Sequence, residues 1–124
     1  GPNDGVQIKY AAWRANGMSG QITAERLLAL IGSGDAPMIL DVRSDREFAD
    51  GHVPGAAHLP FWQISWRAST IPAGKDRELV VYCGHGPRAM IAGRALRKQG
   101  FTRVVYLKGH FSQWRREGRR EERS

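Results

Sequence analysis

"VVYCGHGPRAM", residues 80–90, is the stretch that decides the fold. An apolar run ends at Cys83, two glycines and a proline follow, and Arg88 comes five residues after the cysteine. The β-branched run predicts a buried strand, and Pro87 suits the first position of a helix. We therefore expect a strand, a tight loop and a helix, with the loop at the carboxyl end of the strand.

The same alternation continues on both sides of this stretch. Apolar runs predict short strands at residues 38–41, 56–59, 79–82 and 104–107, and helices are expected at 23–32, 44–50, 61–70, 87–99 and around Phe111 and Trp114. Thr23 is a candidate N-cap, and Ser44 and Glu47 have the spacing of a capping box. Continuous apolar strands between helices are typical of a parallel sheet that is covered on both faces. The expected fold class is therefore α/β.

Length and composition fit one domain with a packed core, since the chain has 124 residues of which 41% are hydrophobic. Residues 1–62 carry five Lys or Arg and seven Asp or Glu, a balance of −2, whereas residues 63–124 carry fourteen and five, a balance of +9. This asymmetry can attract anions or simply form a solvated basic face. No arginine–aromatic alternation or zinc-ligand spacing is present, so we expect no nucleic-acid partner.

The expected organisation is an N-terminal extension at residues 1–19, a domain at residues 20–117 and a charged tail at residues 118–124. Gly1 and Pro2 are interpreted as a protease-site remnant within a linker, and "RREGRREERS" as a fraying, solvated end. No apolar run reaches the ~18 residues of a membrane span. A single cysteine excludes an internal disulfide and fits a reducing compartment. We expect a cytoplasmic location, with a membrane tether in flanking sequence as the alternative.

The loop after the predicted strand has the chemistry of an anion site. Its glycines allow successive N–H groups to turn inward, and the following helix directs its positive end into the same space. Such surroundings stabilise a thiolate at Cys83, and Arg88 adds a planar donor fork that suits an oxyanion. A buried, inert cysteine is the alternative. The glycines and the arginine together favour a nucleophile that attacks an anionic sulfur or phosphorus centre.

Three stretches together resemble the rhodanese domain, a sulfurtransferase family. They are "ILDVRSDREFADGHVPGAAHLP" at residues 39–60, "VVYCGHGPRA" at residues 80–89 and "GFTRVVYLKGHFSQW" at residues 100–114. The resemblance covers about residues 20–117. It implies a three-layer fold around a mainly parallel sheet of about five strands. It also implies that a sulfane sulfur passes from a donor such as thiosulfate to cyanide or a thiol through a persulfide on the cysteine.

The resemblance also assigns roles to residues, with Cys83 as the nucleophile. The expected substrate-binding residues are Gly84, His85, Gly86, Arg88 and Ala89, and the expected supporting residues are Asp41, Arg43, Glu47 and Pro87. We expect Asp41 to order the adjacent backbone and Arg43 to pair with Glu47. No cofactor is implied, and the histidines lack the spacing of a metal site.

Some residues depart from the family pattern. Ala89 stands where many members have serine, and Gly109-His110 replaces a common glycine pair. His85 is unusual beside the nucleophile and either acts near the persulfide as a cation or proton donor or points to solvent.

Two alternative functions stay open. Related phosphatases and arsenate reductases use a loop one residue longer, so the five-residue step to Arg88 favours sulfur transfer. A regulatory or membrane-tethered binding module of a larger protein is the other alternative.

Overall fold

A five-stranded sheet organises the chain, which was analysed as a computed structural model that describes residues 20–124. The strands are β1 (Gln21–Ile22), β2 (Met38–Asp41), β3 (Ala57–His58), β4 (Leu79–Tyr82) and β5 (Val104–Leu107). Their order is β1-β5-β4-β2-β3, and every pairing is parallel. The expected mainly parallel sheet of an α/β fold is confirmed, whereas the predicted N-terminal extension at residues 1–19 lies outside the described residues.

The edge strand β1 was not expected, because two residues are too few for a periodic signal. It pairs with Tyr106 and Leu107 of β5. In the sequence, residues 21–22 look like the residues before a helix, because Thr23 follows them as the N-cap of α2. The Thr23 hydroxyl accepts the N–H of Arg26.

The helices are α2 (Ala24–Gly32), α3 (Asp45–Asp50), α4 (Ile64–Arg67), α5 (Pro87–Lys98) and α6 (His110–Arg116). The expected capping box of Ser44 and Glu47 begins α3, and Pro87 occupies the first turn of α5, where a missing N–H costs nothing. The single helix expected at residues 61–70 is instead η2 (Phe61–Gln63), α4 and η3 (Ala68–Thr70). Only Ile64 and Ala68 of this segment are buried, so little packing holds a regular helix together.

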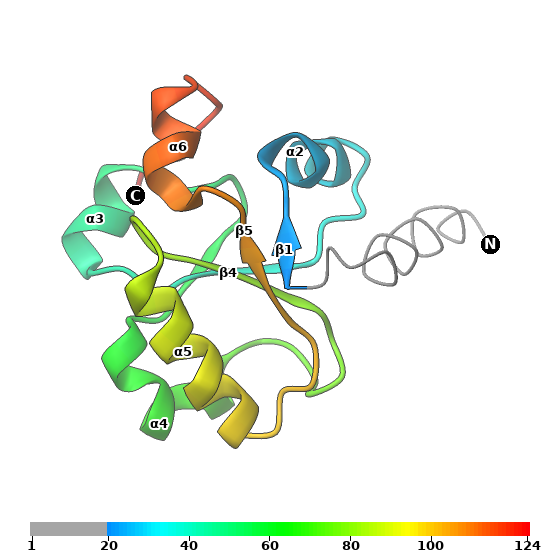
Figure 1. Cartoon of the computed structure of the whole chain (residues 1–124), viewed down its shortest axis with the longest axis vertical. Coiled ribbons are helices and arrows are strands. Elements are labelled where there is room, and N and C mark those ends of the chain that lie inside the picture. The colour runs from blue at the N-terminus through cyan, green and yellow to red at the C-terminus, as the bar shows by residue number, and fades with distance from the viewer. Residues whose placement is uncertain (1–19) are drawn as a thin grey trace.

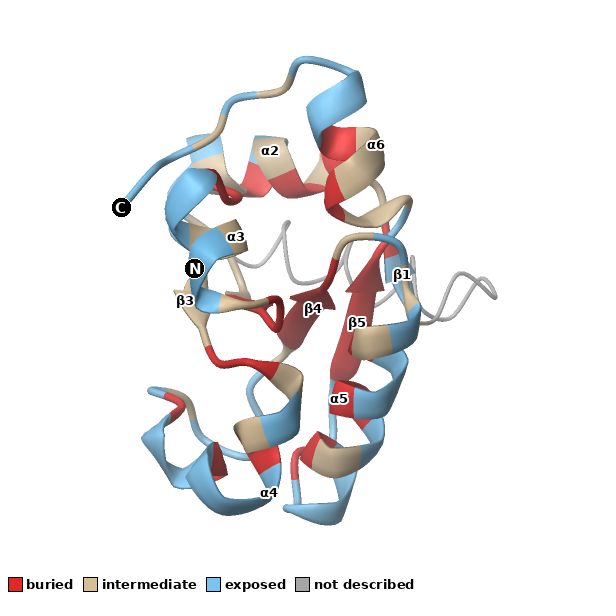
Figure 2. Ribbon diagram, turned by 90° about the vertical axis from the view of Figure 1, so that its left-hand side faces the viewer, coloured by how far each residue is buried: buried red, intermediate tan, exposed pale blue. Residues whose placement is uncertain are grey.

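Side chains from successive strand positions point to opposite faces of the sheet and build two cores. On one face, Leu79 and Val81 pack with residues of α4 and α5. On the other face, Val80 and Tyr82 pack with residues of α2 and α6. Figures 1 and 2 show α4 and α5 on one side of the strands and α2 and α6 on the other, with the buried residues directed toward the sheet. This arrangement gives the expected three layers.

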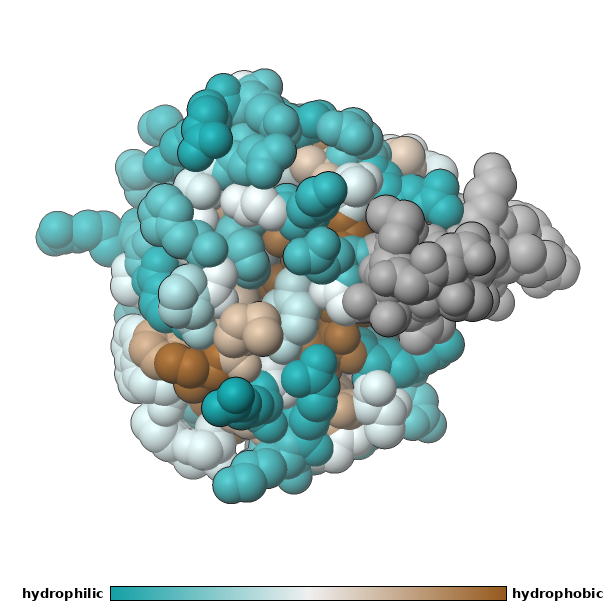
Figure 3. Space-filling view, in the orientation of Figure 1, coloured by the Kyte–Doolittle hydropathy of each residue, from teal (hydrophilic) through white to brown (hydrophobic). Residues whose placement is uncertain are grey.

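A few large apolar side chains stay at the surface near α4 and α5. Trp62 and Trp66 are 48% and 66% exposed, and Met90 and Ile91 are also exposed. The buried face of α5 is formed by Ala89, Ala92, Gly93 and Leu96. Figure 3 shows apolar side chains over this part of the molecule and further ones near the centre of the same face, among hydrophilic ones. None of the helices in residues 20–124 is long and apolar enough to cross a membrane.

The expectation of a fraying C-terminal end is wrong. His52 and Glu122 exchange backbone hydrogen bonds of 2.8 Å in both directions, and the Glu122 carboxylate accepts the N–H of Gly55 at 2.8 Å. The indole N–H of Trp114 donates to the carbonyl of Arg120 at 2.9 Å. The charged composition of the tail did not predict these contacts, because most of them are made by backbone groups, which every residue type has. The tail therefore closes over the turn after α3, as Figure 1 shows at the C-terminus.

The topology gathers the functional candidates at one edge of the sheet. The carboxyl ends of parallel strands meet at one edge, which is where ligands bind in open α/β folds. β4 lies between β2 and β5, so Cys83 is flanked by Asp41 at the end of β2 and by the turn that leads into α6.

Candidate active site

Cys83 lies directly after β4 and is 1% exposed. Its Sγ accepts the backbone N–H of Gly86 at 3.0 Å, so the loop curls around the sulfur. Gly86 has a φ of 131°, which side-chain-bearing residues rarely adopt, and it forms the N-cap of α5. The glycine thus permits the turn that aims an N–H at the thiol.

The surroundings of the sulfur favour its charged form. Burial by itself raises the pKa of the Cys83 thiol, but hydrogen bonds from His110 and from the backbone of Ala89 and Gly86 outweigh it. The pKa falls to about 7 as a result. A thiol with this pKa is about half ionised at neutral pH, which makes it a competent nucleophile.

Arg88 connects the loop after Cys83 to α3. Its Nη1 and Nη2 donate to Oε1 and Oε2 of Glu47 at 2.6 and 3.1 Å, a two-pronged ion pair. The hydrogen bonds from Arg88 are the main cause that lowers the pKa of Glu47 to about 2. The guanidinium also approaches the loop backbone, because a Cβ on Gly84 would lie 3.0 Å from Nη2. Arg88 therefore links the active loop to α3 through Glu47.

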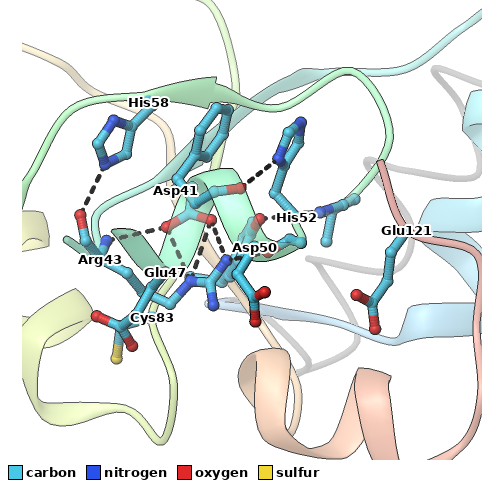
Figure 4. Close-up of polar contacts among 12 residues, drawn as sticks. Asp41, Arg43, Glu47, Asp50, His52, His58, Cys83 and Glu121 are labelled. Carbon is cyan, nitrogen blue, oxygen red and sulfur yellow. Dashed lines mark hydrogen bonds and ion pairs between the residues drawn. The ribbon is translucent and has the colours of Figure 1, made fainter. Parts of the chain in front are cut away.

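Arg43 does not pair with Glu47, which corrects the sequence-based expectation. Its Nη2 lies 2.7 Å from Oδ2 of Asp41 and donates to the carbonyl of Gly51 at 2.6 Å. Both members of this pair are buried. Asp41 also accepts the backbone N–H of Arg43 at 2.9 Å, so it orders the adjacent backbone as expected. Figure 4 shows these contacts of Asp41 and Arg43 beside Cys83 and Glu47.

His52 and His58 support the backbone around the Asp41–Arg43 pair. The rings of His52 and His58 stack on either side of Phe48 at centroid distances of 3.7 and 4.6 Å. His52 donates from Nδ1 to the carbonyl of Phe48 at 2.8 Å, and His58 donates from Nε2 to the carbonyl of Arg43 at 2.7 Å. Figure 4 shows both rings with these contacts as dashed lines. Their nitrogens are thus engaged in holding the turn after α3.

The remaining loop candidates lie around the sulfur with different exposure. His85 is exposed, Gly84 and Gly86 are partly buried, and Ala89 is buried on the inner face of α5. Pro87 begins the helix, so its missing N–H falls at a position that needs no intrahelical partner.

His110 is the site residue that sequence reasoning missed. It follows the turn after β5, and its Nδ1 accepts the backbone N–H of Cys83 at 3.2 Å. The signal was present, because a histidine replaces one glycine of a pair that the resemblance marks. Its partner Cys83, directly after β4, became apparent only once the order of the strands was known.

Within residues 20–124, no group of three His, Cys, Asp or Glu side chains could hold a metal ion. The chemistry that these residues offer is that of an activated thiol that accepts backbone hydrogen bonds from Gly86 and Ala89.

The chain is similar to several known proteins. The profile of the rhodanese-like domain family matches residues 23–117. A sulfurtransferase of Allochromatium vinosum is 37% identical over 101 residues, which cover 82% of this chain and 92% of that protein. The thiosulfate sulfurtransferase GlpE of Stutzerimonas stutzeri is 35% identical over 95 residues, covering 77% of this chain and 84% of that protein.

Some relatives are longer than this chain. The alignments span 50% and 59% of the length of two Bacillus subtilis proteins that are 30% and 37% identical to it.

A solved structure gives the same picture. The crystal structure of the Alr3790 protein from Anabaena sp. superposes with a TM-score of 0.73 at 32% identity and covers 82% of this chain and 91% of that one. Together these relatives support rhodanese-type sulfur transfer as the general function of the chain. The chain belongs to the family of rhodanese-like domains.

Proposed function

We propose that the chain transfers a sulfane sulfur from a small anionic donor of the thiosulfate type to a thiol, through a persulfide on Cys83. The observation that carries the proposal is the cradle of the sulfur, in which the N–H of Gly86 donates to Sγ at 3.0 Å. A pKa of about 7 makes the thiolate available at neutral pH. The GlpE relative, named as a thiosulfate sulfurtransferase, supports the choice of donor class.

The first half-reaction loads the cysteine. The Cys83 thiolate attacks the outer sulfur of thiosulfate, an S–S bond forms to Sγ, and the S–S bond of the donor breaks. Sulfite leaves with the electron pair, and the persulfide carries the negative charge that the thiolate had. The N–H groups of the loop around Sγ can stabilise negative charge at the site by donating hydrogen bonds, without reorganising.

The second half-reaction unloads the cysteine. An acceptor thiolate, or cyanide in an assay, attacks the outer sulfur of the persulfide. The bond from that sulfur to Sγ breaks, and the electron pair returns to Sγ as the Cys83 thiolate. One cysteine is enough for the whole cycle, in agreement with the single cysteine of the chain.

The Arg88–Glu47 pair bears on how the anion is recognised. Glu47 offsets the charge of Arg88 and engages both of its terminal nitrogens. We therefore assign anion binding mainly to the loop N–H groups, with the remaining donors of Arg88 in a secondary role.

Mass spectrometry of the intact protein tests the proposal. Treatment with thiosulfate should add one sulfur atom to the chain, and cyanide should remove it with release of thiocyanate. Cys83→Ser should keep the fold, form no adduct and lose sulfur transfer to cyanide. Because no other cysteine exists, any thiol adduct reports on Cys83.

Two results would overturn the proposal. One is the absence of an adduct with thiosulfate and with other sulfane donors, and the other is full turnover in Cys83→Ser. Hydrolysis of an aryl phosphate that depends on Cys83, without sulfur transfer, would favour a phosphatase instead.

A further inference from the structure

His110 holds a backbone conformation that an ordinary residue avoids. Its φ of 53° is the only positive φ of a non-glycine residue within residues 20–124, and it directly follows Gly109 with a φ of 79°. A glycine would adopt this conformation without strain, whereas a histidine there is strained. Such strain persists where surrounding contacts hold the residue in place.

Hydrogen bonds to Cys83 and its neighbour keep His110 in this conformation. Nδ1 of His110 accepts the N–H of Cys83 at 3.2 Å. The next two residues bind the same loop, since the N–H of Phe111 donates to the carbonyl of Cys83 and that of Ser112 to the carbonyl of Gly84, each at 3.0 Å. The start of α6 is therefore locked onto the beginning of the active loop.

The far side of the imidazole faces the end of the same loop. A Cβ on Gly86 would lie 3.4 Å from Nε2 of His110. Because Nδ1 accepts a hydrogen bond, the neutral ring carries its proton on Nε2. That N–H lies beside the glycine whose own N–H donates to Sγ at 3.0 Å. The ring thus spans the turn that carries the sulfur.

The charged side chains around this edge of the sheet are engaged with one another. The pairs are Arg88 with Glu47, Arg43 with Asp41, and Arg115 with Glu121. His85 in the loop and Lys108 after β5 are exposed, and burial raises the pKa of Tyr82 on β4. The imidazole of His110, by contrast, is bound to the nucleophile itself.

We propose that His110 is a positioning residue for Cys83, which fixes the backbone of the nucleophile and stabilises its sulfur anion. This role rests on the proposed sulfur transfer, in which the anion appears twice. It is the attacking thiolate when the donor is cleaved, and it is the leaving thiolate when the bond between Sγ and the outer sulfur breaks. The hydrogen bond from His110 is one of the causes that lower the pKa of the Cys83 thiol to about 7, against the effect of burial.

The test measures the ionisation of Cys83 directly and needs no sulfur substrate. The single cysteine allows the rate of alkylation by iodoacetamide, followed against pH, to report on this thiol alone. His110→Gly should fold, since glycine relieves the positive φ. It should raise the pKa of Cys83 by about one unit, which lowers alkylation at pH 7 about five-fold.

His110→Asn separates the two parts of the role. Asparagine tolerates a positive φ and offers an oxygen in place of Nδ1, but it has no group that matches Nε2. Hydrogen exchange at the Cys83 amide should therefore accelerate in His110→Gly and stay slow in His110→Asn. The alkylation profile should shift upward in both variants. Lys108→Ala, which removes an exposed cation from the same turn, should leave the profile unchanged.

An unchanged alkylation profile in folded His110→Gly would overturn the role in stabilising the anion, and unchanged exchange at the Cys83 amide would overturn the positioning role. These failures are distinct from failure of the proposed function, which the persulfide measurement on the unaltered chain decides. If His110→Gly loads normally, single-turnover release of sulfur to cyanide should also be slower than in the unaltered chain.

Discussion

Glu47 serves both the fold and the site with one carboxylate. Its Oε1 accepts the N–H of Ser44 at 3.1 Å, which closes the capping box of α3, and the N–H of Arg88 Nη1 at 2.6 Å. The side chain that begins a helix therefore also anchors the loop around Cys83. At the residue scale, the site depends on such shared side chains rather than on separate catalytic and structural sets.

Glu47→Gln should weaken both the cap and the ion pair. We expect a loss of about 1 kcal/mol in the free energy of unfolding near neutral pH, because the pair is partly exposed and solvent screens it. The bond to Arg88 holds the pKa of Glu47 at about 2, below its ordinary value. The contribution is therefore complete above the ordinary pKa and is lost as the pH falls through about 2.

Chemical denaturation of both proteins at several pH values measures this effect. The difference between wild type and Glu47→Gln should be constant from about pH 5 to 8 and should shrink below about pH 4. Asp45→Asn, on the same helix with a side chain that is 90% exposed, is the matched control and should show the smaller change. An equal loss in both variants would contradict a special role for Glu47.

At the scale of elements, α5 packs closely against β5 at Gly93. Gly93 lies on the buried face of α5, and a Cβ there would collide with the ring of Tyr106. The absence of a side chain lets the helix lie close to the sheet, and this helix begins directly at the active loop. The position of α5 against β5 thus contributes to the placement of the loop N–H groups.

Gly93→Ala should destabilise the protein although alanine is the better helix former. Overpacking against the ring is expected to cost about 1–3 kcal/mol, which exceeds the gain of up to about 1 kcal/mol in helix propensity. Gly32→Ala, at the end of α2 with open space around it, should be neutral or stabilising. Thermal or urea unfolding of the two variants checks this. Equal stability of Gly93→Ala and wild type would mean that Tyr106 moves aside freely.

For the whole molecule, the C-terminal tail is part of the folded domain. It pairs with His52, and Ser124 donates its N–H to the carbonyl of Ala49 at 3.1 Å, so the end of the chain contacts α3. α3 carries Glu47, and the turn after it supplies the carbonyl of Gly51 that binds Arg43. The tail therefore lies behind the structure that supports the active loop.

Removal of residues 121–124 should destabilise the protein by about 1–2 kcal/mol, since several backbone hydrogen bonds are lost and their partners return to water. Hydrogen exchange should accelerate at the amides of His52 and Gly55, which donate to Glu122. The amide of Leu79, which donates to Arg103 on the far side of the molecule, should change only with global stability. Unchanged exchange at His52 would show that the tail contributes nothing to this turn.

Much of this molecule could be predicted from local patterns. Short apolar runs mark β2, β4 and β5, and the caps of α2 and α3 and the proline of α5 mark where helices begin. Two-residue strands and short helical turns could not be predicted in the same way. β1 and the segment around α4 carry too few residues for a periodic signal, and packing decides their form.

The sequence by itself determined the chemistry of the loop, because the cysteine, glycines and arginine are local to it and strand and helix propensities place them at a turn. Tertiary structure alone decided which side chains reach that loop. The strand order β5-β4-β2 brings His110 to one side of Cys83 and the Asp41–Arg43 pair to the other. Partners such as Glu47 for Arg88 are 41 residues apart in the chain. No short-range pattern specifies such a pairing, which follows only when parallel strands bring their carboxyl ends to one edge.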